Sequence, residues 1–137
     1  MSTIFKKIID REIPASIVYE DETVLAFLDI YPIKKGHVLV VPRKEYINIF
    51  DIDPVVFAHM ATIAQRIARV LMLVVKARGV NIHMNNGEEA GQDIFHAHLH
   101  VIPRFTRGEA FTAPVHESYA AGEDKNLADE IRKMLCA

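Results

Sequence analysis

The clearest periodic pattern in the chain runs from Asp53 to about Arg78. Apolar side chains recur there every three or four residues, which places them on one face of a helix that packs against a core. Asp53 followed by Pro54 is a favoured helix start, and Gly79 is the residue type favoured just beyond a helix end. The pattern predicts one long core helix with these inward positions: Met60, Ile63, Ala64, Ile67, Leu71 and Val74 or Val75.

Two shorter amphipathic segments stand near the two ends of the sequence. Residues 3–10 form the first, which ends before Pro14 because proline disfavours a helical residue in front of it. Residues 125–135 form the second. We expect a short helix in each, with these apolar sets: Ile4, Phe5, Ile8 and Ile9 in the first, and Leu127, Ile131 and Leu135 in the second.

Five segments have the length and patterning of β-strands. The first two are separated only by Asp21 and Glu22, as in a hairpin, and the last ends before Pro103. Since neighbouring strands are joined by short links, the sequence predicts an α+β fold. This fold has an antiparallel sheet of about five strands, the long core helix and short N- and C-terminal helices. The expected strands cover residues 16–20, 23–29, 37–42, 80–85 and a histidine-containing segment that starts at 96.

The composition is that of a single folded domain. The chain has 137 residues, of which 50% are hydrophobic and 25% charged, and this balance fits one globular unit rather than a disordered chain. Residues 105–137 are expected to form an irregular C-terminal extension that carries the short helix. The net charge of −2 and the lack of a basic stripe argue against nucleic acid or an anionic membrane surface as a partner.

Cysteine content and hydropathy indicate a reducing compartment. Cys136 is the one cysteine in the sequence, so it has no partner for an internal disulfide. Residues 1–16 carry charges throughout and lack the unbroken apolar core of a signal peptide. The longest apolar run, residues 70–75, is too short to span a bilayer. These features predict a soluble, cytoplasmic protein.

Candidate chemistry is concentrated in the segment FHAHLHVIPR, residues 95–104. His96, His98 and His100 alternate with apolar residues, so in an extended segment the three imidazoles share one face. The sequence contains seven histidines in all, and three of them therefore lie in register beside a glycine-containing loop, residues 85–93.

Spacing alone leaves three interpretations of these histidines open. They could be surface residues of a strand, metal ligands, or the nucleophile and proton donors of a reaction at phosphorus. For a metal, neighbours about 6.6 Å apart could share an ion, but the outer pair, about 13 Å apart, could hardly do so. No further Cys, Asp or Glu has a convincing ligand spacing. Phosphoryl chemistry accounts for register, number and loop together, since backbone N–H groups of residues 87–91 could hold phosphate oxygens.

The segment GQDIFHAHLHVIPR resembles the signature of the histidine triad (HIT) family, His-x-His-x-His followed by apolar residues. Residues 4–44 resemble the N-terminal half of the nucleotide-binding branch of that family, and residues 80–92 resemble the part before its triad. The resemblance implies a HIT-like fold, with residues 1–137 as a single HIT domain. It also implies hydrolases and transferases that act on the α-phosphate of substituted purine nucleotides through a nucleotidyl-histidine, without a metal or other cofactor.

The resemblance also implies roles for individual residues. By position in the motif, His98 is the nucleophile, His100 and His96 flank it, and His37 is a further active-site histidine. An AMP- or GMP-like purine nucleotide is the implied ligand, and a homodimer with its sheets joined across a two-fold axis is the implied assembly. The matching nucleotide-binding positions are Asp29 and Ile30 for the nucleoside, with Asp29 accepting ribose hydroxyls, and Asn85, Gly91, Gln92 and Asp93 for the phosphate side.

The chain departs from the family pattern at two places. Many bacterial relatives hold a structural zinc with two cysteines near the N-terminus, a histidine after the third strand and the first triad histidine. Here Thr3, Lys6 and Glu45 occupy the first three places and only His96 is left, so we predict no bound metal. Asp93 stands where some relatives have a serine that can help to protonate the leaving group, a step that an ionised carboxylate cannot perform.

The leading hypothesis is therefore a phosphoramidase or related nucleotidyl hydrolase. The alternatives are a nucleotide-binding regulator with vestigial catalysis, a dinucleoside polyphosphate hydrolase and a histidine-based metal-binding protein. Glu88, Glu89 and Asp93 beside the expected phosphate site favour an amine leaving group over a long polyphosphate, because like charges repel. We assign no role to the other three histidines: His59, which we expect on the surface of the long helix or in its packing, His83, which we expect to face outward, and His116, in a loop.

Overall fold

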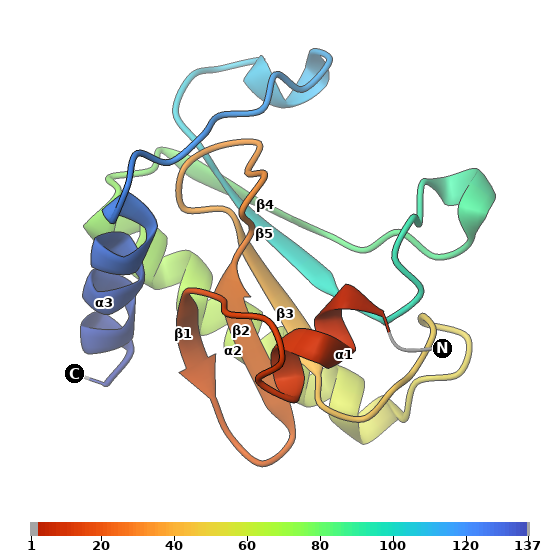
Figure 1. Cartoon of the computed structure of the whole chain (residues 1–137). Helices are drawn as coiled ribbons and strands as arrows, with labels where there is room; N and C mark the ends of the chain where they lie inside the picture. The colour runs from red at the N-terminus through yellow and green to blue at the C-terminus, as the bar shows by residue number, and fades with distance from the viewer. Residues whose placement is uncertain (1–2, 137) are drawn as a thin grey trace.

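The computed structural model describes residues 3–136 and contains a five-stranded sheet in which every neighbouring pair is antiparallel (Figure 1). The strand order is β1-β2-β3-β5-β4. The predicted α+β fold with five strands is confirmed. The strands are β1 (Ile17–Glu20), β2 (Val24–Leu28), β3 (Val38–Pro42), β4 (Gly79–His83) and β5 (Leu99–Arg104).

The helices divide between the two faces of the sheet. The main core lies on one face, where α2 (Pro54–Val74) and α3 (Glu123–Cys136) pack against the strands (Figure 1). The other face carries α1 (Ile4–Ile9), whose buried Phe5 and Ile8 pack on side chains of β2 and β3. Because α1 is short, it covers only part of its face.

The predicted core helix is confirmed, and its start is the predicted one. The Asp53 carboxylate accepts the backbone N–H of Val55 at 2.8 Å, and Pro54 is the first helical residue. Among the described residues, α2 alone has the length and composition of a membrane-spanning helix. Its apolar stripe is buried against the sheet, and a core helix needs such a stripe as well.

The predicted end of this helix is wrong. The helix ends at Val74 rather than near Arg78, and Lys76 adopts a left-handed backbone conformation with φ of 57°. The N–H of Arg78 then donates to the carbonyl of Arg104, which starts the pairing of β4 with β5. Gly79 is therefore the first residue of β4 and not the residue that follows the helix.

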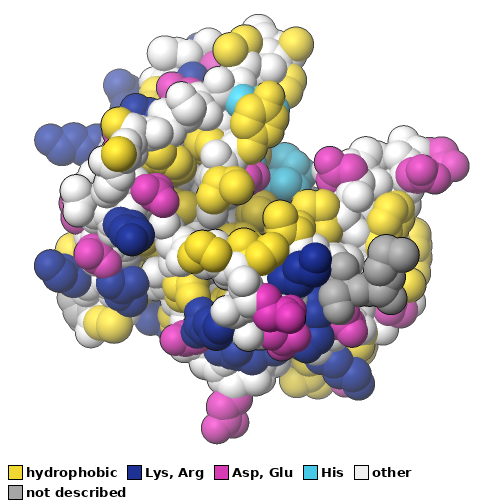
Figure 2. Space-filling view, in the orientation of Figure 1, with side chains coloured by type: hydrophobic (Ala, Val, Ile, Leu, Met, Phe, Trp, Pro, Cys, Tyr) yellow, Lys and Arg dark blue, Asp and Glu magenta, His cyan; other side chains and the backbone are white. Residues whose placement is uncertain are grey.

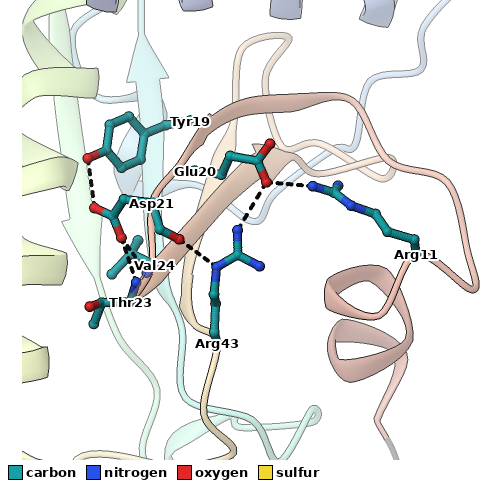
Figure 3. A network of polar contacts seen from close by, with 7 residues as sticks. All are labelled: Arg11, Tyr19, Glu20, Asp21, Thr23, Val24 and Arg43. Carbon is teal, nitrogen blue, oxygen red and sulfur yellow. Dashed lines mark hydrogen bonds and ion pairs between the residues drawn. The ribbon is translucent and has the colours of Figure 1, made fainter.

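The β1–β2 hairpin predicted from the sequence is confirmed, and Asp21 holds its turn (Figure 3). The Asp21 carboxylate accepts the N–H groups of Thr23 and Val24 at 2.8 Å and the Tyr19 hydroxyl at 2.7 Å. His59 of α2 also contacts it, with Nε2 2.6 Å from Oδ2. Burial raises the pKa of Asp21, but these hydrogen bonds outweigh burial and hold the pKa below its usual value. His59 thus ties α2 to the hairpin.

The C-terminal part of the chain is irregular up to α3, as predicted, apart from a short 3₁₀ turn at Glu109–Phe111. It runs back along the loop between β2 and β3, where the N–H of Glu117 donates to the carbonyl of Pro32 at 2.8 Å. The Tyr119 hydroxyl accepts the N–H of Gly36 at 2.9 Å. The helix α3 then joins the main core through Ala128, Ile131 and Leu135.

Candidate active site

A pocket of about 330 Å³ opens on the sheet face that α1 covers in part. Figure 2 shows histidine at the bottom of a hollow that is bordered by hydrophobic side chains. A concave, mainly apolar pocket with a few convergent polar groups is typical of a small-molecule site. The structure brings these predicted site residues together on its surface: Asp29, Ile30, His37, Asp93, His98 and His100.

An apolar wall closes one side of this pocket. Phe5 of α1 meets His98 edge to face, with ring centroids 4.9 Å apart, and packs in the same way on Phe27 at 5.6 Å. Ile8 of α1 and Leu39 of β3 extend the wall. These side chains exclude water from the imidazole of His98, and exclusion of water disfavours the charged form of a histidine.

The register of the histidine segment is as predicted, although β5 itself begins only at Leu99. Before that residue the backbone bonds to another loop, through the N–H of Ala97, which donates to the carbonyl of Tyr46 at 2.8 Å. Ala97 and Leu99 face the main core, while His98 lines the pocket on the opposite side of the chain. The alternation of side chains thus extends beyond the strand.

The backbone fixes the tautomer of neutral His98. Its Nδ1 lies 2.7 Å from the carbonyl oxygen of His96, and because that oxygen can only accept, Nδ1 carries the proton. The other ring nitrogen, Nε2, is then left with an unshared electron pair. His98 therefore offers a nucleophilic nitrogen at the pocket surface.

A chain of hydrogen bonds fixes the tautomers of His37 and His100 in the same way. The N–H of Ile33 donates to Nδ1 of His37 at 3.1 Å, so the proton of neutral His37 is on Nε2. This Nε2 donates a hydrogen bond to Nδ1 of His100, 3.0 Å away. Neutral His100 therefore carries its own proton on Nε2, which makes it a hydrogen-bond donor beside His98.

Burial keeps these imidazoles uncharged at neutral pH. It lowers the pKa of His98, of His37 to about 3 and of His100 to about 2, with further lowering from neighbouring histidines. The hydrogen bond to the His96 carbonyl and the charge of Asp93 act in the opposite direction on His98 without cancelling the effect of burial. A neutral nucleophile is thus available without deprotonation by a base.

His96 is behind the pocket rather than in it. It is buried, and its Nε2 donates to the carbonyl of Pro42 at 2.7 Å. Within residues 3–136, its buried Nδ1 has no hydrogen-bond partner. This geometry ties the histidine segment to the end of β3 and leaves His98 and His100 as the triad members at the pocket surface.

The loop before the triad is held together from inside. Gln92 is buried, its Oε1 accepts from Asn48 and from the N–H of Gly87, and its Nε2 donates to two backbone carbonyls. The N–H groups of Ala90 and Gly91 also donate within the loop. The loop therefore does not offer these N–H groups to a ligand, and the prediction of a phosphate cradle in residues 87–91 is wrong for Gly87, Ala90 and Gly91.

The other predicted loop residues differ in their positions. Gly91 has φ of 91°, the left-handed conformation that favours glycine, and a side chain there would point toward Asn85. Neither of these two residues lines the pocket, whereas Asp93 does. Across the pocket, Asp29 accepts the N–H of Tyr31 at 2.9 Å, and burial raises the pKa of its carboxyl group.

A metal ion was one interpretation of the histidines, and one group of side chains has the spacing for it. Ligand atoms of Asp29, His37 and His100 lie within 4.8 Å of one another. However, Nδ1 of His37 already accepts from Ile33, and its Nε2 pairs with Nδ1 of His100. A metal would have to break these bonds, so the cluster is a hydrogen-bonded pair of histidines rather than a ready metal site.

Comparison with known proteins identifies the family of this chain. The model of the HIT domain matches residues 10–107. The chain belongs to the HIT family. The protein called hit of Bacillus subtilis is 39% identical over 98% of this chain and 94% of its own length.

Two solved structures of HIT proteins share the fold closely. One is a hypothetical histidine triad nucleotide-binding protein of Sulfolobus tokodaii, 33% identical, with a TM-score of 0.86 over 96% of this chain and 91% of that chain. The other is a zinc-bound histidine triad family protein of Mycobacterium smegmatis, 36% identical, with a TM-score of 0.87 over 99% and 94%. The expected HIT fold is thereby confirmed.

The residues at the places of the family's structural zinc do not fit that metal. Thr3 caps α1 by accepting the N–H of Lys6, and the ammonium group of Lys6 pairs with Asp10 at 2.9 Å. The Nε2 proton of His96 is donated to Pro42. Structural zinc requires four ligands, usually Cys and His, and Lys6 is a cation. Absence of zinc stays a prediction, which stoichiometric zinc in metal analysis of the purified HIT protein would overturn.

Two histidines without a predicted role lie at this HIT site. His83 faces away from the main core, as expected, but its ring stacks on that of His100 with centroids 4.5 Å apart. His116 lines the pocket and stacks on Tyr31 with centroids 3.7 Å apart. The sequence gives no local signal for either contact, because His83 reaches the site through strand pairing and His116 through the course of the C-terminal segment.

Proposed function

We propose that this HIT protein is a nucleotide hydrolase or nucleotidyl transferase of the phosphoramidase type, acting through a covalent bond between phosphorus and Nε2 of His98. The observation that carries the proposal is the pair of tautomers set by the backbone. The carbonyl of His96 leaves the electron pair of His98 on Nε2, and the N–H of Ile33 leaves the proton of His100 on Nε2. A nucleophile and a hydrogen-bond donor thus stand side by side.

The reaction proceeds in two displacements at the α-phosphorus. Nε2 of His98 forms the new N–P bond, and the bond to the leaving amine breaks, with its electron pair going to the amine, which takes a proton from solvent. Water then attacks phosphorus, the N–P bond returns its electron pair to Nε2, and the proton of the water goes to solvent. His100 stabilises the developing charge by donating from Nε2 to a non-bridging oxygen, while His37 holds the tautomer of His100.

The apolar wall and Asp29 supply the nucleoside site of this proposal. Phe5, Ile8 and Leu39 suit the flat faces of a purine, and the side chain of Ile30 at the pocket rim adds to this surface. The Asp29 carboxylate keeps acceptor capacity for ribose hydroxyls, since its described hydrogen bond involves only the N–H of Tyr31. An AMP- or GMP-like nucleotide would thus place its α-phosphate toward His98.

The Asp93 carboxylate favours an amine as the leaving group. Asp93 lines the pocket, whereas Glu88 and Glu89 lie exposed in the 3₁₀ turn of the preceding loop and do not line it. The carboxylate of Asp93 would repel a polyphosphate chain and attract a protonated amine. It acts to raise the pKa of His98 and of Asp29, as a negative charge close to both groups does.

A homodimer with continuous sheets is part of the same proposal. β4 is an edge strand, and Ile82 is exposed on it. A second copy that pairs along this edge would cover both the unpaired backbone groups and the isoleucine. Sedimentation equilibrium of the whole chain tests this, and a monomer at all concentrations would contradict it. A cytoplasmic location remains a proposal from the sequence alone.

A substrate pulse followed by intact-mass analysis tests the proposed chemistry. Adenosine phosphoramidate should leave one nucleotidyl group on the wild-type protein, and peptide mapping should place it on His98. His98→Asn should abolish turnover but retain AMP binding by calorimetry, and His59→Leu, a variant outside the pocket, should keep both. An adduct on another residue, or turnover by His98→Asn, would contradict the proposal.

Steady-state turnover of two substrates, together with AMP binding, separates the alternative functions. Faster turnover of diadenosine tetraphosphate than of adenosine phosphoramidate, compared as kcat/KM, would reject the amine preference. AMP binding without turnover of either substrate would indicate a regulator whose catalysis is vestigial.

A further inference from the structure

His83, the last residue of β4, stands directly opposite His100 in the pairing of β4 with β5. Directly opposed residues of an antiparallel pair have their side chains on the same face of the sheet. The two rings are stacked, with centroids 4.5 Å apart and planes 26° apart. His83 therefore touches the imidazole at the end of the hydrogen-bond chain that starts at Ile33.

The other polar contact of His100 holds only one place on its ring. The bond from His37 meets one atom, Nδ1, at 3.0 Å, and a single hydrogen bond restricts rotation of the ring about the Cβ–Cγ bond without fixing it. His98 meets the ring at an angle of 63° with centroids 4.9 Å apart, which is an edge contact. The nearly parallel ring of His83 lies against a face of His100 and opposes this rotation.

Stacking on His100 is the one ring-on-ring contact of His83 within residues 3–136. In the same part of the chain its ring takes part in no hydrogen bond or ion pair, and part of it is exposed. Burial, with a smaller effect from the charge of Arg104, lowers the pKa of His83. The ring is therefore uncharged at neutral pH and stacks on His100 without repulsion between two cations.

We propose that His83 is a positioning residue, whose ring holds His100 so that its Nε2–H points at the reacting phosphate. The inference rests on the proposed function, since it assigns His83 a part in that reaction. This role requires a flat ring at position 83, but it does not require that ring to donate or accept a hydrogen bond. Phenylalanine should thus replace His83, whereas an aliphatic side chain should not.

Steady-state kinetics with adenosine phosphoramidate test the inference. His83→Leu should lower kcat about two- to tenfold, the effect expected from loss of one ring-on-ring contact, with KM unchanged. His83→Phe should keep kcat within about twofold of wild type, and His59→Leu serves as the control for loss of a histidine outside the pocket. Wild-type kcat in His83→Leu, or an equal loss in His83→Phe and His83→Leu, would overturn the inference.

A measurement without substrate separates this inference from the proposed function. In protein with ¹⁵N-labelled histidine, NMR of the imidazole nitrogens reports the tautomer of His100. We expect the Nε2–H tautomer in wild type and His83→Phe, and averaged or broadened signals in His83→Leu. Unchanged His100 signals in His83→Leu would refute the positioning role. If the signals change as expected while the wild type fails to turn over substrate, the proposed function fails, although His83 still orients the ring of His100.

Discussion

Buried neutral histidines make the stability of this protein depend on pH, and the direction follows from their pKa values. Burial lowers the pKa of His37 to about 3 and of His100 to about 2. In the unfolded chain both should titrate near the usual value of about 6.5. The unfolded state therefore binds more protons than the native state below this pH, so the stabilisation is complete above about pH 6.5 and is lost as the pH falls toward 3.

The size of the effect is set by the two pKa differences. Once the unfolded chain is protonated, each group lowers the free energy of unfolding by about 1.4 kcal/mol per pH unit. Between pH 7 and pH 5 this amounts to about 2 kcal/mol for each histidine and about 4 kcal/mol for the pair. The lowered pKa values of His96 and His98 act in the same direction. Such a loss is large compared with a typical total stability of about 5–15 kcal/mol.

Urea unfolding at pH 7 and pH 5 measures this loss. The chain has no tryptophan, so far-UV circular dichroism is the appropriate signal. His100→Asn removes one of the two titrations and should lower the difference between the two pH values by about 2 kcal/mol. Ile131→Val, in the main core on the other face, should lower stability by about 0.5–1.5 kcal/mol at both pH values and leave the difference unchanged.

An equal free energy of unfolding at pH 7 and pH 5, with an unchanged m-value, would refute this reasoning. It would mean that the imidazoles titrate in the native protein as they do in the unfolded chain, and that burial does not keep them neutral. The same loss in His100→Asn as in wild type would refute the assignment of this effect to His100.

Three further substitutions test how the pocket is supported. Phe5→Ala removes the buried ring beside His98 and should lower the free energy of unfolding by about 3–5 kcal/mol in urea titration, whereas a loss under 1 kcal/mol would show that α1 does not depend on it. Gly36→Ala places a Cβ at φ of 100° and should cost about 1–2 kcal/mol in the same assay, and an unchanged midpoint would contradict the assigned conformation. Gln92→Glu removes the donors to the carbonyls of Ile47 and Ile94, so it should lower the free energy of unfolding by about 1–3 kcal/mol and speed up amide exchange in the loop before the triad. Unaltered exchange would contradict the supporting role of Gln92.

The elements that the sequence predicted well are those set by local rules. The start of α2 depends on Asp53 and Pro54, and the β1–β2 turn depends on Asp21, all of which act on residues within a few positions. The end of α2, by contrast, depends on a residue far away in the sequence. The N–H of Arg78 donates to Arg104, a residue of β5, and this distant pairing ends the helical pattern before Gly79.

The site shows the same difference between features set within one segment and features set by contacts between segments. Alternation within one segment predicted that His98 and His100 share a face, and both line the pocket. The stacking of His83 on His100 depends on the strand order, in which β5 lies between β3 and β4, and no local pattern encodes that order. The family resemblance supplied His37 but not His83. The internal bonding of Gln92 was missed because it depends on the backbone of Ile47 in a separate loop.

The short helix α1 links the stability of this protein to its proposed chemistry. Phe5 packs on His98 and on Phe27, so one side chain completes the apolar packing between α1 and the sheet and also dehydrates the proposed nucleophile. Dehydration alone would leave the nitrogen that attacks phosphorus unspecified. The carbonyl of His96 supplies this second condition, because it binds the proton at Nδ1 and leaves the electron pair on Nε2. Burial decides the charge of His98 and the backbone decides its tautomer, so a neutral, oriented nucleophile needs no general base.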